Sequence, residues 1–124
     1  MGLILLIIAV VASCILFPIS LMYTLFRSIV IGLLRPLRLK PIKYILDLCK
    51  SIAIGIDQLG NVVCQDVFND TLIKKTGHKF GNPDETVSRV LGINKKTNTL
   101  SKFGKWWADF LNWVDPNHVE NASK

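Results

Sequence analysis

A run of 24 residues without a charged side chain, LILLIIAVVASCILFPISLMYTLF at positions 3–26, constrains this chain more than any other feature. At a rise of ~1.5 Å per residue, a helix of this length spans about 36 Å, compared with about 30 Å for the hydrocarbon core of a bilayer. Pro18 is tolerated in such a helix because neighbouring groups satisfy the backbone it frees. We therefore expect residues 1–26 to form a transmembrane helix.

Three alternatives fit the run less well. A cleaved signal peptide has a positive n-region and a shorter apolar region. Residues 11–14 are similar to a lipoprotein cleavage box, but residues 15–26 stay apolar where a lipoprotein needs a polar tether. A buried core helix of this length needs more surrounding protein than the rest of the chain supplies.

The excess of basic residues lies directly after this run. Residues 27–50 hold six basic side chains and one acidic one, whereas residues 51–124 hold nine basic and eight acidic ones. The positive-inside rule then places the chain from residue 27 onward in the cytoplasm, with the N-terminus outside. The predicted contacts to anionic lipid headgroups in this stretch are Arg27, Arg35, Arg38, Lys40 and Lys43.

The distal region has no basic excess, so the pI of about 9.4 does not indicate nucleic-acid binding. The three cysteines, Cys14, Cys49 and Cys64, form no CxxC pair and lie far apart in the sequence. A disulfide framework is not expected in a reducing cytoplasm, and no cofactor or metal motif is present.

Residues 27–40 are predicted to continue the first helix at the membrane interface, with a bend at Pro36. In residues 41–75 the apolar side chains recur at steps of three and four, which indicates a long amphipathic helix with Pro41 as its first residue. Asp57 and Asn61 lie one turn apart within it. They form either a solvated face or a hydrogen-bond anchor for the distal region.

Residues 80–124 are predicted to form a small module of short helices, which makes the whole chain all-α. In the segment GNPDETVSRVLG, Asn82 is a good N-cap, Pro83 suits the first helical position, and Asp84 and Glu85 suit the positive end of the helix dipole. With Gly92 as a left-handed stop, we expect a helix over residues 83–91. Neither Thr86 nor Ser88 is needed for this capping.

A second helix of the module is expected from Thr99 or Ser101 to Val114, and a last short one opens at residues 115–118 and ends near Ala122. The second helix is unusually rich in aromatic residues, among them Trp106, Trp107 and Trp113. These tryptophans either fill the core of the small module or lie at the membrane interface, and both uses are open.

Three polar patterns occur in this order: Asp57-Gln58-x-x-Asn61, then PDET with Ser88, then Asp115-x-x-His118. Together they resemble a group of small proteins encoded by tailed bacteriophages, over residues 55–121. The resemblance implies a phage product that acts inside an infected bacterium or at its membrane. It implies no particular activity.

The candidate polar network consists of Asp57, Asn61, Asp84, Glu85, Ser88, Asp115 and His118. Asp115 and His118 share a helix face, but the other histidine, His78, is forty residues away and no HExxH or Cys/His cluster is present. Ser88 is not in a nucleophile elbow. We therefore expect a polar lock between helices, with no catalytic and no metal-binding residues.

The leading functional hypothesis is a non-enzymatic, membrane-anchored phage protein at the host inner membrane, acting in lysis, superinfection exclusion or contact with the envelope. Its expected partners are the lipid bilayer and either a second copy or another protein, and no nucleic acid. The alternatives are a holin-like pore, a virion or ejection component, and a small hydrolase or metal-dependent enzyme that uses the PDET and DxxH residues.

Overall fold

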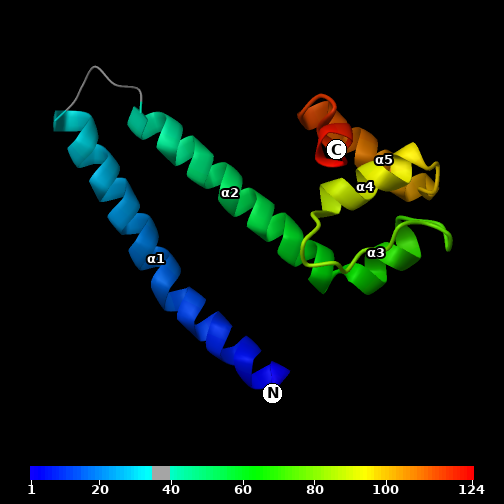
Figure 1. Cartoon of the computed structure of the whole chain (residues 1–124), viewed down its shortest axis with the longest axis horizontal. Helices are drawn as coiled ribbons and strands as arrows, with labels where there is room; N and C mark the ends of the chain where they lie inside the picture. Colours follow the sequence, from blue (N-terminus) through cyan, green and yellow to red (C-terminus); the bar gives the residue numbers. More distant parts are fainter. Residues whose placement is uncertain (35–39) are drawn as a thin grey trace. The chain divides into compact units, whose positions relative to one another are not determined.

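The structure, a computed structural model, describes residues 1–34 and 40–124. These residues form helices and no strand, which confirms the predicted all-α fold (Figure 1). The helices are α1 (Gly2–Leu34), α2 (Lys40–Val63), α3 (Gln65–Thr71), α4 (Val87–Lys96), α5 (Lys102–Val114) and α6 (His118–Ala122). Residues 1–49 and 50–124 form two compact units, each considered by itself below.

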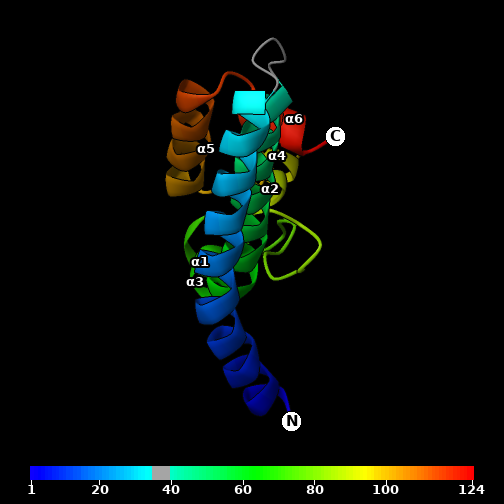
Figure 2. The same ribbon diagram turned by 90° about the vertical axis from the view of Figure 1, so that its left-hand side faces the viewer.

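Helix α1 passes Pro18 without interruption and continues to Leu34 (Figures 1 and 2). It therefore includes the first part of the predicted interfacial segment, whereas the predicted bend at Pro36 lies outside the described residues. None of its hydrophobic side chains is buried in the part of the chain that the structure describes. It is the one helix there that is long and apolar enough to cross a membrane.

The long helix predicted over residues 41–75 is present with an interruption. Helix α2 begins at Lys40 and ends at Val63, and α3 follows after Cys64. Backbone hydrogen bonds from Cys64 to Gly60 and from Phe68 to Cys64 carry the helical direction through the break. Its last segment, residues 72–75, is not helical, because the Lys74 amide and the Leu72 carbonyl bond instead with Thr99 and Ser101.

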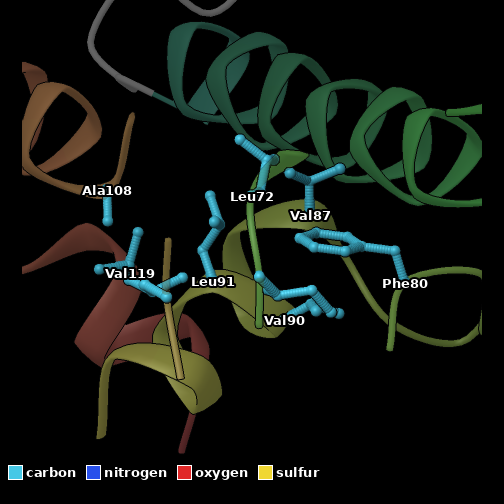
Figure 3. Close-up of a cluster of buried hydrophobic side chains, with 9 residues drawn as sticks. Leu72, Phe80, Val87, Val90, Leu91, Ala108 and Val119 are labelled. Atoms are coloured by element: carbon cyan, nitrogen blue, oxygen red, sulfur yellow. The ribbon is translucent and has the colours of Figure 1, made fainter. Parts of the chain in front are cut away.

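The core of the 50–124 unit lies among α4, α5, α6 and the chain between α3 and α4. Helix α4 packs against both α5 and α6. The buried hydrophobic side chains come from every one of these parts (Figure 3), and they are Leu72, Ile73, Phe80, Val87, Val90, Leu91, Leu100, Ala108 and Val119. An isolated antiparallel bridge between Ile73 and Leu100 joins the two connecting segments.

The start of α4 differs from the prediction. The helix begins at Val87, and its N-cap is Thr86, whose hydroxyl accepts from the Arg89 amide at 3.0 Å. Residues 82–85 form a turn instead, in which the Asn82 side chain accepts from the Asp84 amide. The predicted helix over 83–91 is therefore wrong at its beginning, and Thr86, for which the capping scheme had no use, is the cap.

The end of α4 also differs, because Gly92 does not stop the helix. Helix α4 continues through Gly92 to Lys96. A Cβ atom at this position would overlap the Val119 carbonyl oxygen and lie 2.7 Å from the Cβ of Ser123. Gly92 is therefore the point at which α6 approaches α4, and the absence of a side chain allows that approach.

The two remaining helices agree with the sequence. Helix α5 starts after Ser101, whose hydroxyl accepts from the Gly104 amide at 3.0 Å, and it ends at Val114. Helix α6 follows Asn117, which is in the left-handed conformation with φ 61°. The predicted bounds of α5 and the predicted end of α6 at Ala122 are confirmed, whereas α6 begins at His118, after the Asp115-Pro116 pair that was expected to open it.

We expect Gly92→Ala to lower the free energy of unfolding by about 3 kcal/mol, because the added Cβ must push α6 away from α4. Gly55→Ala is the matched control, since a Cβ at Gly55 meets no atom within 4 Å. In that exposed helical position alanine should raise stability by up to about 1 kcal/mol. Urea denaturation followed by circular dichroism in detergent measures both, and equal effects would contradict the close approach at Gly92.

Candidate functional site

Four of the predicted polar residues form one chain of contacts in the 50–124 unit. The Ser88 hydroxyl donates to Asp57 Oδ2 at 2.9 Å, and it lies 3.1 Å from His118 Nε2. The other ring nitrogen of His118, Nδ1, lies 2.8 Å from Asp115 Oδ2. The series joins α2, α4 and α6. Ser88 links His118 to Asp57 of α2, whereas the acid at Nδ1, Asp115, lies only three residues before His118.

The protons in this series can be counted. Its three contacts need three protons, of which Ser88 supplies one and a neutral imidazole only one more. When both ring nitrogens of His118 carry protons, each contact is a hydrogen bond and both carboxylates are satisfied. With a neutral ring, His118 and Asp57 compete for the single Ser88 proton.

The order Ser88–His118–Asp115 is that of a nucleophile, a base and an orienting acid. Ser88 is 6% exposed and lies in the first turn of α4. Two amides of that turn already have acceptors, because Ser88 N–H donates to Asp57 at 3.4 Å and Arg89 N–H donates to Thr86. An oxyanion in an acyl-transfer reaction needs backbone amides that are free to donate to it. Here the Ser88 and Arg89 amides already donate to side chains of the protein.

Asn61 forms a second polar centre one turn along α2. Its side chain is fully buried, and its amide donates to the carbonyl oxygens of Asn82 at 2.8 Å and Glu85 at 2.7 Å. Its own carbonyl oxygen accepts from the Gly81 amide at 3.0 Å. Asn61 is therefore an anchor for the distal region, and the solvated alternative is excluded for this residue.

The Glu85 side chain contacts two basic side chains. Its carboxylate contacts His78 Nε2 at 2.9 Å and Arg89 Nε at 3.3 Å. Burial by itself raises the pKa of Glu85, but the hydrogen bonds and charges of His78 and Arg89 outweigh burial and hold that pKa below its usual value. The carboxylate therefore remains ionised and fixes His78 and Arg89 around the turn.

Asp84 does not join the network. Its side chain is exposed, and its recorded contact is through the backbone amide, which donates to Asn82. The structure thus brings together Asp57, Ser88, Asp115 and His118 in one cluster, and Asn61 and Glu85 around the adjacent turn.

Asn94 is a central residue that the sequence interpretation missed. It is fully buried in α4. Its side chain accepts from the His78 amide and donates to the His78 carbonyl, both at 2.8 Å. The available signal was its spacing, because Asn94 follows Val90 by four residues and continues the buried stripe of α4.

Asn69 and Asn112 were missed in the same way. Asn69 pairs with both backbone groups of Phe80, and Asn112 accepts from the Val119 amide and donates to Glu120. Lys95 lies 2.9 Å from the same Glu120 carboxylate, and hydrogen bonding to it raises the pKa of Lys95 and lowers that of Glu120.

An open groove runs beside the Ser88–His118 contact, with a volume of about 940 Å³. Apolar side chains form most of its wall, including Ile54, Phe68, Trp107 and Leu111. Asp57, Ser88 and His118 lie along the same wall. The volume is at the upper end of the range for small-molecule sites.

The tryptophans of α5 differ in burial, and a membrane-interface role for the exposed ones stays a prediction. Trp107 is half-buried and packs against the core, whereas Trp106 and Trp113 are exposed. Of the predicted basic contacts to lipid, Arg27 and Lys43 are exposed. Arg35 and Arg38, as well as the side chain of Lys40, lie outside the described residues.

Among the described residues, no group of three or more His, Cys, Asp or Glu side chains is placed to hold a metal ion. The cysteines in this part of the chain are free. Comparisons with known protein families, curated proteins and solved structures find no match to this chain. The functional argument therefore rests on the residues themselves.

We expect Asn61→Asp to lower the free energy of unfolding by about 3 kcal/mol, because a carboxylate oxygen replaces the buried amide that donates to two backbone carbonyls. Asp84→Asn is the matched control at an exposed position of the same turn, and it should change stability by less than about 0.5 kcal/mol. Urea denaturation at pH 7 compares the two. Equal stability of the two variants would show that Asn61 does not anchor the turn.

Proposed function

We propose that the protein is a single-pass membrane protein whose 50–124 unit works by binding at the membrane surface. The observation that carries the proposal is α1, a 33-residue helix with no buried hydrophobic side chain. So much exposed apolar surface is stable in lipid and is rare on a soluble protein. A signal sequence has the same composition, but its apolar region is about 7–15 residues long.

The basic residues after the apolar run support a cytoplasmic location for the 50–124 unit. The resemblance to small tailed-phage proteins supports the inner membrane of an infected bacterium as the place of action. Lysis, superinfection exclusion and contact with the envelope are roles that a membrane-held binding unit can perform. None of these roles requires a reaction, so the proposed function is non-enzymatic.

We expect the full chain to remain in the membrane pellet after carbonate extraction, with residues 1–34 still attached. Cys49 is exposed and lies beyond α1, so it reports the topology. A membrane-impermeant maleimide should label Cys49 only after spheroplasts are lysed, and a Cys49→Ser variant gives the background. Labelling in intact spheroplasts would contradict the orientation, and a chain shortened at its N-terminus would contradict retention.

A small hydrolase is the second candidate, and the Ser88–His118–Asp115 series is the specific observation that favours it. In this case the groove would hold an ester with an apolar acyl group. Ser88 Oγ would attack the carbonyl carbon, and its proton would pass to His118 Nε2 and then to the departing alcohol. Water would release the acid and return a proton to Ser88.

This second candidate makes its own prediction. A fluorophosphonate probe should label the full chain in detergent at Ser88, and Ser88→Ala should abolish the labelling. Ser123→Ala is the control, since the Ser123 hydroxyl donates to the Glu120 carbonyl away from the series. If the folded wild-type chain is not labelled, the hydrolase is contradicted and the binding function remains as the proposal.

A further inference from the structure

The outer face of α5 carries a row of exposed aromatic side chains. Phe103, Trp106, Phe110 and Trp113 follow one another at steps of three, four and three, which places them on one side of the helix. Their exposed fractions are 53%, 56%, 42% and 80%. Aromatic side chains of this size usually lose most of their exposed area in a core or an interface.

Within the described residues of the 50–124 unit, the core packs against the other side of α5. The opposite side of α5 holds Gly104 and Ala108, both buried, with Trp107 and Leu111 packed against the core. A Cβ at Gly104 would overlap the Leu72 carbonyl oxygen, so that side of the helix already lies against the backbone. The row therefore points away from the interior, and core packing does not explain it.

The rings of the row are already ordered against one another. The centroids of Phe103 and Trp106 are 5.7 Å apart, those of Trp106 and Phe110 are 6.0 Å apart, and those of Phe110 and Trp113 are 6.3 Å apart. Each of these pairs is stacked. A preorganised surface loses less side-chain entropy on binding than a disordered one.

The charges near the row favour an anionic partner. Lys102 and Lys105 are exposed at the beginning of α5. The acid of this helix, Asp109, lies 3.3 Å from Lys95, so its charge is opposed by a neighbouring cation. A helix that lies in the headgroup region of a membrane typically combines tryptophan and phenylalanine with lysine.

We propose that this face binds the surface of the bilayer that holds α1, with Trp106 and Trp113 at the boundary between headgroups and acyl chains and Lys102 near anionic phosphates. The proposal rests on the proposed membrane anchoring. It goes further, because it identifies the ligand of α5 as anionic phospholipid. An anchored chain meets lipid at high effective concentration, so a modest affinity suffices.

Two single-tryptophan variants of the full chain test this. The first variant carries Trp106→Phe and Trp107→Phe, so Trp113 is its remaining tryptophan. The matched control carries Trp106→Phe and Trp113→Phe, so Trp107 is its remaining tryptophan. Both are reconstituted into vesicles of phosphatidylcholine and phosphatidylglycerol with brominated acyl chains, which quench nearby tryptophans. We expect quenching of Trp113 to be at least about twofold stronger than that of Trp107, since one faces lipid and the other the core.

A wild-type measurement covers the case in which a variant does not fold. Quenching of the unmodified chain by acrylamide, which is neutral, should weaken when phosphatidylglycerol replaces part of the phosphatidylcholine, and Lys102→Gln together with Lys105→Gln should reduce that change. No difference between the two lipid compositions would overturn the role of anionic lipid.

The outcomes separate the two proposals. A chain that does not float with the vesicles contradicts the anchoring. A chain that floats, with equal quenching of Trp113 and Trp107, overturns the binding of α5 to lipid and leaves the anchoring intact. Protection of Trp113 from acrylamide without quenching by brominated lipid, together with cross-linked dimers, would assign the face to a second copy and would also overturn the proposal.

Discussion

Side-chain carboxamides on three helices hold the segment between α3 and α4, and the rest of the 50–124 unit depends on them. Asn61 of α2, Asn69 of α3 and Asn94 of α4 each bond to both donors and acceptors of its backbone. A carboxamide offers both functions at one short side chain, which a carboxylate or an alkyl group does not. These hydrogen bonds fix the path of the segment, and Phe80 reaches the core from it.

The helices were predictable from the sequence where they depend on hydrophobic spacing or on capping by residues that are close in the chain. The apolar run of α1 and the Ser101 cap of α5 follow from residues that are close together along the chain. The ends of α4 were not predictable in this way. Asn61, which is twenty or more residues away in the sequence, holds residues 81–85 in a turn. Gly92 does not end the helix, and its missing side chain instead leaves room for the backbone of α6.

The same distinction applies to the candidate site. Residue type and order identified Asp57, Ser88, Asp115 and His118, and the structure shows that they meet. Spacing could not show that Asp84 faces solvent or that Asn94 is buried, because both depend on where other helices lie. The division of the α5 tryptophans between core and surface was open for the same reason, since composition alone does not say which side of a helix is covered.

The burial of Val119 has a consequence for the order of folding. Helix α6 is synthesised after the other five helices, yet its Val119 is fully buried between parts made earlier, and its backbone fills the space beside Gly92. The core therefore closes only once α6 has been made, by which time α1 has long been available to the membrane. Under the proposed anchoring, insertion of α1 would come first, and the 50–124 unit would complete its fold while already held at the bilayer.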